Sequence, residues 1–519
     1  MVKANVLWVD DEIDLLRIQI LYLEEKGHDV STANNGDDAL DMIQENNYDI
    51  IFLDENMPGI SGLDVLVEIK KLKPNIPVVM VTKNEEEDIM DEAIGSKIDD
   101  YLIKPVNPKQ IILSIKKNVY NKRLITEKTT SKYQTEFNKI SSDISKASSV
   151  EDWYNLYQDL VYWELELDKT QENTMDEVLT TQKDDANQEF SKFIKNNYIN
   201  WFKEDTENKP NMPFDFFRKK VIPLLDKKEK IFVIVIDNLR LDQWKAMEPI
   251  INNHMITEEE EMWMSMLPTA TQYARNALFA GLTPLEISKR HPELWLNDED
   301  EGGKNNFEET LLEHLLHRYR RKIKFNYNKV LNNKSGHRVN DQFSNLLQDQ
   351  LSVVVYNFVD ILSHARTDTK MIRELANDDA AYRDLTITWF EHSPLLELIR
   401  KISKENIKTF IVTDHGSKNV TNPVKVIGDR HTTTNLRYKH GRNLGYNKKL
   451  VFELTEPHKA GLPVSNISSS YIFTYNQDFF AYPNNYNHYV KYYKNTFQHG
   501  GISLEEMLIP CIKLKPKNN

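Results

Sequence analysis

A long stretch without glycine or proline divides this chain of 519 residues. Neither residue occurs between Lys109 and Lys209, although the whole chain contains 16 glycines and 19 prolines. Because glycine and proline are the residues that most often break helices, the stretch is predicted to be helical. Trp153, Tyr157 and Leu160 follow one another at steps of four and three, so they share one helix face and are expected to form the core of a helical bundle.

On either side of this stretch, short apolar runs alternate with amphipathic segments. The first part contains VLWV, DIIFL, PVVMVT and DYLIK, and the last part contains IFVIVID, SVVVYNFVD and KTFIVTD. This alternation is typical of α/β domains whose parallel strands are buried under helices. We therefore predict an α/β domain at residues 1–121, a helical bundle linker domain at 122–206 and a second, mostly parallel α/β domain at 207–519.

Composition narrows the classes of function. The formal net charge of −13 argues against a general, non-specific grip on nucleic acid or on an anionic membrane, which needs a basic surface. The chain does not open with basic residues followed by an apolar run, and no segment reaches the ~20 apolar residues that span a bilayer. We therefore expect a cytoplasmic protein without membrane insertion. Cys511 is the only cysteine, so any metal is expected on aspartate and histidine side chains.

Polar side chains that suit phosphoryl transfer end the apolar runs of the first domain. They are Asp10, Asp11, Asp54, Thr82 and Lys104. Functional groups gather at the carboxyl ends of strands in such sheets, and carboxylates that meet there require a hard cation such as Mg²⁺. Asp54 is then the candidate acceptor of an acyl phosphate. We expect Lys104 to pair with the phosphoryl oxygens, Thr82 to hydrogen-bond to them, and Tyr101 to follow the movement of Thr82.

A second set of polar residues follows the apolar runs of the last domain. It comprises Asp237, Thr271, Asp360, His364, Asp414, His415 and His499. Asp360 and His364 are four residues apart, so on a helix they face the same way and suit one ion, which His499 completes. The other three ligands and Thr271 suit a second ion. With nitrogen and oxygen ligands alone, zinc is the leading candidate and manganese the runner-up. Two ions ~4 Å apart promote displacement at phosphorus, with metal-bound Thr271 as the candidate nucleophile.

The first domain resembles the receiver domain of bacterial two-component response regulators. The resemblance is carried by VDD, LDENMPG, the VT pair and the KP that follows DYLI. It implies a flavodoxin-like fold, phosphorylation of Asp54 by a sensor histidine kinase, Mg²⁺ on Asp10 and Asp11, and a switch formed by Thr82 and Tyr101. A lysine follows Thr82 where a small residue is usual, which puts the lifetime of the phosphoryl group in question.

The fragments of the last domain resemble the alkaline phosphatase superfamily, and within it the PglZ domain. The resemblance is carried by their order: a strand-end aspartate, a threonine, DILSH, DHG, and HGG before EMLIP. The fusion to a receiver is similar to the PorX type of response regulator, which is tied to type IX secretion. This resemblance implies phosphodiesterase activity on cyclic or linear oligonucleotides and homodimer formation promoted by receiver phosphorylation. It implies one zinc ion on Asp360, His364 and His499, and a second on Asp237, Thr271, Asp414 and His415.

Two segments supply candidate substrate contacts. Arg275 and Asn276 follow the threonine and are candidate donors to a phosphoryl oxygen; their alternative role is to cap and pack the helix that follows. Residues 419–449 hold seven lysines and arginines against a single aspartate, which predicts a local positive patch for the phosphates of an oligonucleotide. The candidates within it are Arg430, His431, Lys439 and His440. The alternative for this segment is a solvated insertion that binds no substrate.

Two other classes of function stay open at this point. One is a metal-stabilised docking platform that binds a sigma factor or a secretion component without catalysis, although the hydroxyl of Thr271 favours an enzyme. The other is a DNA-binding regulator, but no clear basic recognition helix occurs between Leu124 and Lys209. The metal ligands do not choose among phosphomonoester, phosphodiester and sulfate ester substrates. The leading interpretation is a zinc-dependent phosphodiesterase controlled by a receiver.

Overall fold

The chain forms two compact units. The computed structural model describes residues 3–73, 76–83, 98–170, 173–203, 206, 209–298, 300–368, 378–428, 432–464 and 469–517. The first unit comprises Met1–Thr135 with Thr170–Glu172, and the second comprises Glu136–Lys169 with Asn173–Asn519. Within the described part of the chain, no helix combines the length and the apolar character that crossing a bilayer requires.

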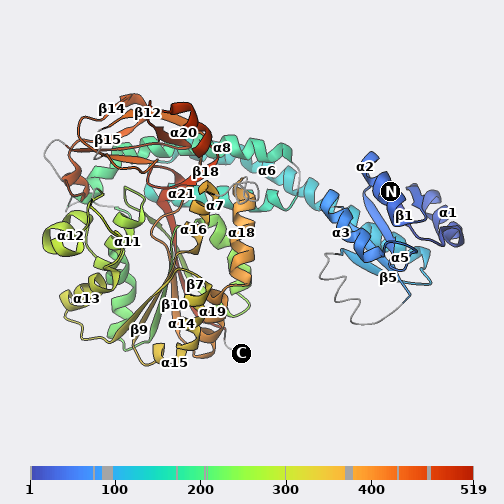
Figure 1. The fold of residues 1–519 in the computed structure, drawn as a ribbon, viewed down its shortest axis with the longest axis horizontal. Coiled ribbons are helices and arrows are strands. Elements are labelled where there is room, and N and C mark those ends of the chain that lie inside the picture. Colours follow the sequence, from blue (N-terminus) through green and yellow to red (C-terminus); the bar gives the residue numbers. More distant parts are fainter. Residues whose placement is uncertain are drawn as a thin grey trace. The chain divides into compact units, whose positions relative to one another are not determined.

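The first unit contains a five-stranded parallel sheet in the order β2-β1-β3-β4-β5 (Figure 1). Its strands are β1 Asn5–Val9, β2 Asp29–Ala33, β3 Ile50–Asp54, β4 Val78–Thr82 and β5 Asp100–Ile103. Its helices include α1 Arg17–Glu25, α2 Gly36–Glu45, α3 Gly62–Leu72 and α5 Pro108–Ile115. This strand order is that of the flavodoxin-like fold, and it confirms the predicted fold class. Because alternate side chains point to opposite faces, Leu7 and Leu53 enter one apolar cluster while Trp8 and Phe52 enter the other.

The stretch without glycine and proline is helical, as predicted. It forms α6 Asn121–Lys146, α7 Val150–Asp168 and α8 Asn173–Asn197. Ser149 begins α7 with a capping box, in which its hydroxyl accepts from the Asp152 N–H. Trp153 is buried against Phe190 of α8, with ring centroids 5.3 Å apart. Helices α7 and α8 belong to the second compact unit, and the domain boundaries at residues 121 and 206 stay predictions.

The second unit is built on a six-stranded sheet in the order β7-β19-β10-β6-β9-β8. The strands are β6 Ile231–Ile236, β7 Met255–Met264, β8 Phe325–Val330, β9 Leu351–Tyr356, β10 Lys408–Val412 and β19 Leu508–Pro516. Neighbours from β10 to β8 are parallel, and β19 is antiparallel to both β10 and β7. Every residue of β6 and β9 is buried, as expected for parallel strands covered on both faces. The predicted mostly parallel sheet is confirmed.

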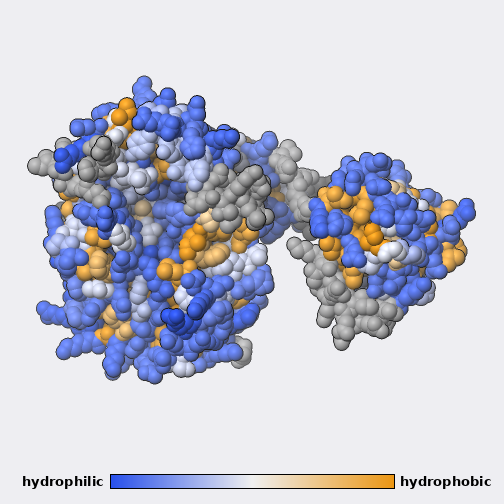
Figure 2. Space-filling model, viewed as in Figure 1, coloured by the Kyte–Doolittle hydropathy of each residue, from blue (hydrophilic) through white to orange (hydrophobic). Residues whose placement is uncertain are grey.

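Helices cover both faces of this sheet, with α11, α12 and α13 on one side and α18 and α19 on the other (Figure 1). The helices are α9 Ile222–Asp226, α10 Leu241–Ile251, α11 Thr271–Ala280, α12 Pro284–Arg290, α13 Glu308–Arg318, α14 Asn333–Asp341, α15 Phe343–Leu346, α16 Phe358–Asp368, α18 Asp379–Glu391 and α19 Pro394–Lys404. In α19 the buried side chains Leu395, Leu398, Ile399 and Ile402 recur at steps of three and four, which is the spacing of one helix face. Seen from the same side, the surface is mainly hydrophilic (Figure 2).

Smaller sheets lie at one end of the six-stranded sheet, where Figure 1 shows β12, β14, β15 and α20 together. One pairs β11 Lys418–Val420 with β18 Thr496–Gln498. A second contains β12 Asn422–Ile427, β14 Gly445–Tyr446 and β17 Asp478–Ala481, and a third contains β13 Tyr438–Gly441, β15 Phe452–Leu454 and β16 Ser470–Phe473. Two helices accompany them, α20 Tyr486–Tyr493 and α21 Leu504–Met507. These segments add walls to the end of the sheet at which the strand-end aspartates lie.

Candidate functional site

The strand-end residues of the first unit meet as the sequence predicts. Lys104 Nζ lies 2.8 Å from Asp10 Oδ2 and 3.0 Å from Asp54 Oδ1. Carboxylate oxygens of Asp10, Asp11 and Asp54 all lie within 4.8 Å of one another. Burial raises the pKa of Asp54, and Lys104 opposes that rise. One ammonium group thus faces three carboxylates, and this oxygen-only donor set fits a hard cation such as Mg²⁺.

Thr82 and Tyr101, the two predicted switch residues, lie in different environments. The Thr82 hydroxyl donates to the carboxylate of Glu55, the residue that follows the candidate phosphate acceptor. Tyr101 is 41% exposed, so its ring lies at the surface. Helix α3 passes close to the Asp54 carbonyl, and a Cβ on Gly62 would lie 2.1 Å from that oxygen. A glycine is therefore required for α3 to begin here.

The seven predicted ligands of the second unit come from five elements and their ends. Asp237 follows β6, Thr271 begins α11, and Asp414 and His415 follow β10. Asp360 and His364 lie on α16, and His499 follows β18. These positions confirm the predicted local structure: strand ends for the aspartates and one helix face for the DILSH pair. The roles of these residues as ligands stay predictions.

The first candidate metal cluster consists of Asp360, His364 and His499, whose donor atoms lie within 4.8 Å of one another. His364 Nε2 is 3.5 Å from Asp360 Oδ2, and His499 Nε2 is 3.7 Å from Asp360 Oδ1. Burial raises the pKa of Asp360 to about 6, with the charge of Asp237 adding to the rise. A carboxylate in this environment gains from a nearby cation.

The second cluster consists of Asp237, Asp414 and His415, all of them buried. The Thr271 hydroxyl lies 3.1 Å from His415 Nε2 and 3.4 Å from Asp237 Oδ1. The two clusters are neighbours, because the rings of His415 and His499 stack with centroids 4.4 Å apart. The structure therefore places all seven residues at one centre, with the hydroxyl of Thr271 directly against the second cluster.

Backbone carbonyls orient the two buried histidines. His415 Nδ1 lies 3.1 Å from the carbonyl oxygen of Gly416, and His499 Nδ1 lies 3.1 Å from that of Thr269. A carbonyl only accepts, so each Nδ1 carries the proton and each Nε2 presents its lone pair to the cluster. In this tautomer each Nε2 is able to bind a metal ion.

The second cluster also contains a buried oxygen without a hydrogen-bond partner. Asp414 is fully buried, and its Oδ2 receives no hydrogen bond among the described residues. Burial raises the pKa of Asp414, and His415 opposes the rise. An unsatisfied buried carboxylate oxygen is costly unless a cation neutralises it. The mixed oxygen and nitrogen donor sets of both clusters therefore fit metal ions of the zinc type.

Sequence reasoning missed several residues that hold the ligands in place. Asn238 has a positive φ of 64° and its N–H lies 3.4 Å from Asp414 Oδ1, while its side-chain amide lies 3.4 Å from Asp360 Oδ1. It thus bridges the two clusters. Asn357 donates to Asp237 Oδ2 at 3.0 Å. Asn238 follows the strand-end residue Asp237, and Asn357 follows the last residue of β9. This position after a strand was the sequence signal that could have identified them.

The predicted substrate contacts after Thr271 require correction. Arg275 is buried, with Nη1 2.5 Å from Asp237 Oδ2 and Nε 2.6 Å from Glu308 Oε1. The Asn276 amide is also buried and donates to the Lys304 carbonyl. Both side chains are engaged inside the protein, so they stabilise the site rather than reach a substrate.

The predicted basic patch at residues 419–449 also requires correction. Lys439 is fully buried with its Nζ 2.8 Å from the Thr433 carbonyl, and burial lowers its pKa to about 7. His440 is buried and stacks on Tyr471 with centroids 4.1 Å apart. Arg437 is buried in an ion pair with Glu506. Arg430 and His431 lie outside the described residues. The buried side chains therefore do not belong to a positive surface, whereas Lys425, Arg442, Lys448 and Lys449 are exposed, and a patch formed by these four stays a prediction.

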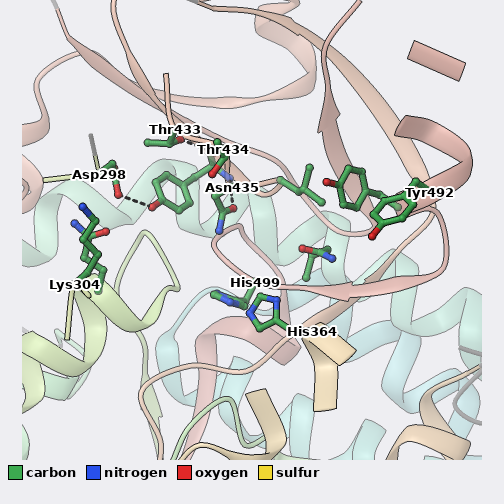
Figure 3. Close-up of a pocket in the computed structure, with 13 residues that line it drawn as sticks. Asp298, Lys304, His364, Thr433, Thr434, Asn435, Tyr492 and His499 are labelled. Atoms are coloured by element: carbon green, nitrogen blue, oxygen red, sulfur yellow. Dashed lines mark hydrogen bonds between the residues drawn. The ribbon is translucent and has the colours of Figure 1, made fainter. Parts of the chain in front are cut away.

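A pocket with a volume of about 490 Å³ opens beside the first cluster. Figure 3 shows His364 and His499 at one end, Asp298 and Lys304 at another, and Tyr492 across from them. The segment from Thr433 to Leu436 forms a further part of its wall. The Asn435 side chain accepts from the N–H groups of Arg437 and Tyr438, which fixes this wall. The pocket thus directly adjoins the first candidate metal cluster.

Three family models match the chain in order. The response regulator receiver domain matches residues 6–116, the PorX response regulator linker domain matches residues 123–202, and the BREX system PglZ alkaline phosphatase-like domain matches residues 216–514. The last match covers more than half of the chain. Together they define a two-component regulator with a hydrolase-like output domain.

Individual relatives match a shorter part. Transcriptional regulatory protein ResD of Bacillus subtilis is 36% identical over 114 residues, which are 22% of this chain and 47% of ResD. Transcriptional regulatory protein SrrA of Staphylococcus aureus is 35% identical over 112 residues, 22% of this chain and 46% of SrrA. The chain thus spans less than half the length of these curated relatives. A Francisella response regulator 1452 receiver domain is 30% identical, with 23% of this chain and 98% of that chain covered and a TM-score of 0.22.

The chain belongs to the PglZ alkaline phosphatase-like family, and its receiver, linker and output modules in this order are those of a PorX-type response regulator.

The glycine of the DHG fragment provides a direct test of the second cluster. A Cβ on Gly416 would lie 2.0 Å from the Glu505 carbonyl oxygen, so Gly416→Ala is expected to displace the loop that carries Asp414 and His415. We expect zinc affinity, measured by competition with a chelator, to fall by ~10-fold or more. Gly445→Ala is the control, because its Cβ would meet only Ile427 carbons at 3.3 Å and beyond. Unchanged zinc affinity in Gly416→Ala would contradict the assignment.

Proposed function

We propose that this protein is a response regulator whose output domain hydrolyses phosphodiester bonds in cyclic or linear oligonucleotides. Asp54 accepts a phosphoryl group from a sensor histidine kinase, and Thr271 is the nucleophile of the output reaction. The observation that carries the proposal is the position of the Thr271 hydroxyl, 3.1 Å from His415 Nε2 and 3.4 Å from Asp237 Oδ1. A hydroxyl held at the edge of a cluster with an unsatisfied carboxylate oxygen is where a metal-activated nucleophile is expected.

The donor sets favour two zinc ions in the output domain and Mg²⁺ in the receiver. Asp360, His364 and His499 would hold one zinc ion, and Asp237, Thr271, Asp414 and His415 would hold the other. Asp10, Asp11 and Asp54 would hold Mg²⁺. When bound, the two zinc ions supply charge stabilisation for the attacking and leaving oxygens. Manganese is the alternative metal for the output domain.

The proposed reaction has two displacements at phosphorus. Thr271 Oγ1 forms a bond to phosphorus while the bond to one ester oxygen breaks, and that oxygen leaves as an alcohol after taking up a proton. Water then attacks the same phosphorus, the bond to Thr271 breaks, and a phosphomonoester is released as the threonine regains its proton. Asn238, Asn357 and Arg275 keep the ligand side chains in place throughout. Two inversions give net retention at phosphorus.

The pocket beside His364 and His499 supports a substrate with a large group on phosphorus. Apart from Lys304 and Asp298, its wall is uncharged and includes the rings of Tyr492 and Tyr493. Asp298 accepts from the Tyr438 hydroxyl at 3.1 Å, so its charge is already engaged. An uncharged polar wall with aromatic rings suits a nucleoside better than a second phosphate.

This proposal is preferred to a docking platform that binds a sigma factor or secretion component without catalysis. A platform needs neither a hydroxyl at the second cluster nor a pocket beside the first. The role in type IX secretion, the phosphorylation-promoted homodimer and the cytoplasmic location belong to the proposal as expectations from the PorX-type resemblance.

Phosphorylation of Asp54 is the first test of the proposed function. With acetyl phosphate and Mg²⁺, we expect the wild-type chain to gain one phosphoryl group, measured by intact-protein mass spectrometry under mild conditions. Asp54→Ala removes the acceptor and is expected to abolish the gain. Asp41→Ala, an exposed position on α2, is the control and should label like the wild type. Full labelling of Asp54→Ala would show that another residue accepts the phosphoryl group.

The nucleophile is tested by Thr271→Ala. We expect turnover of methyl 4-nitrophenyl phosphate and of a dinucleotide to fall by at least ~10³-fold, because removing a covalent nucleophile costs several orders of magnitude. Thr271→Ser keeps the hydroxyl and is expected to retain much of the activity. Metal content by mass spectrometry establishes that zinc remains in both variants. Undiminished turnover in zinc-loaded Thr271→Ala would refute the threonine mechanism.

The nucleoside pocket is tested by Tyr492→Leu. Loss of base stacking on this ring is expected to raise KM for a dinucleotide by ~5-fold or more, since such stacking contributes ~1–3 kcal/mol. Turnover of methyl 4-nitrophenyl phosphate, which carries no base, should change by less than ~twofold. Tyr489→Leu on the same helix is the control, because Tyr489 is 37% exposed and does not line the pocket. Equal KM values for the dinucleotide in both variants would place the base elsewhere.

A further inference from the structure

A network of charged side chains, most of them buried, joins α7 and α8 to the output domain. All of its members lie in the second compact unit. The cations are Lys183, Arg240, Arg383 and Lys418, and the carboxylates are Glu164, Asp168, Asp242, Asp379 and Glu505. Charges that are removed from water are costly to unpair. The network therefore holds the linker helices in one defined position on the output domain.

Glu505 of α21 is where α8 meets the output domain. Its Oε1 lies 2.8 Å from Lys418 Nζ and 3.8 Å from Lys183 Nζ. Its Oε2 accepts from the amide of Asn187 at 3.2 Å, and the Asn187 Oδ1 accepts from the Leu504 N–H at 2.8 Å. Burial raises the pKa of the Glu505 carboxyl, but the ammonium groups of Lys418 and Lys183 outweigh this effect and lower that pKa to about 2. Two residues of α8, one turn apart, thus hold the first turn of α21.

Helix α21 in turn contacts the loops that carry both metal clusters. The Gly416 N–H donates to the Glu506 carbonyl at 3.1 Å, directly after His415. The Gly501 N–H donates to Glu506 Oε1 at 2.9 Å, two residues after His499. Lys418 pairs with Gln498 across the β11–β18 ladder. A displacement of α21 would therefore move His415 and His499 relative to one another.

Helix α8 is also hydrogen-bonded to α6. Gln182, next to Lys183, donates to the Phe137 carbonyl at 3.0 Å and to Ser141 Oγ at 2.8 Å. Helix α6 begins in the first compact unit and continues into the second. A continuous set of contacts thus runs from the helix that leaves the receiver, through α8 and α21, to the metal-binding loops.

We propose that Asn187 and Lys183 are positioning residues through which the linker helices control the metal affinity and turnover of the output centre. The proposal rests on the proposed metal centre, and it assigns the linker a direct regulatory role rather than that of a spacer. Neither side chain touches the substrate. Their effect is transmitted by the position of α21, so a change at α8 alters zinc binding and the chemical step more than substrate binding.

The test compares four variants of the full-length chain. Asn187→Leu keeps the branched shape and removes the two side-chain hydrogen bonds to α21 together with the one to the Lys183 carbonyl. Lys183→Met removes the ammonium group, and Lys183→Arg keeps the charge. Lys192→Met is the matched control, because Lys192 lies on the same helix in an exposed pair with Glu189 at 2.6 Å. The measurements are zinc affinity by chelator competition, the visible absorption of the Co²⁺-substituted protein, and kcat and KM for methyl 4-nitrophenyl phosphate.

We expect zinc affinity to fall ~10-fold or more in Asn187→Leu and Lys183→Met, with an altered Co²⁺ spectrum, a lower kcat and a nearly constant KM. Lys183→Arg should recover most of the loss, and Lys192→Met should match the wild type. Wild-type zinc affinity and Co²⁺ spectra in folded Asn187→Leu and Lys183→Met would overturn the proposal. If Lys183→Met does not fold, Asn187→Leu decides alone. If the wild type hydrolyses no diester but the variants still lose zinc affinity, the proposed function fails while the positioning role stands.

Discussion

The burial of carboxylates at the carboxyl ends of parallel strands is the constraint on which both sites depend. Burial raises the pKa of Asp54 in the receiver and of Asp360 and Asp414 in the output domain. Such groups keep their charge only where cations stand close. Lys104 supplies part of that charge in the receiver, and Arg275 does so beside Asp237. Both sites still carry more carboxylates than side-chain cations. This excess of negative charge favours the binding of divalent metal ions.

Glycine gives the output centre its compactness. Gly416 allows the loop after β10 to approach the Glu505 carbonyl, where a Cβ would lie at 2.0 Å. Gly501 approaches the Arg437 guanidinium in the same way, where a Cβ would lie 2.8 Å from Nε. The glycines of the DHG and HGG fragments thus serve close packing around the ligands. The fragments are recognisable in the sequence because the chemistry of the aspartate or histidine and the packing of the glycine are needed together.

The sequence predicted what depends on local pattern and missed what depends on distant partners. The four-residue step from Asp360 to His364 and the strand-end position of Asp237 follow from periodicity alone, and both are found as predicted. The inward direction of two basic side chains in residues 419–449 was missed, because the net charge of a segment does not show where its side chains point: Arg437 turns inward to Glu506 and Lys439 to the Thr433 carbonyl. The αL conformation of Asn238 and its contacts with Asp360 and Asp414 join residues more than one hundred positions apart, which no local pattern reveals.

The linker helices α7 and α8 are structurally part of the output domain in this protein. Because α7 and α8 are joined to the rest of the second unit by ion pairs such as those between Glu164 and Arg383 and between Lys183 and Glu505, separating them would leave charges unpaired in the interior, which costs several kcal/mol for each pair. The linker is therefore part of the same folding unit as the metal-binding loops. Under the positioning role proposed above, a signal that reaches the linker would not need to release or cover the candidate centre; a small shift of α8 would be enough, since α21 lies between α8 and the loops that carry His415 and His499.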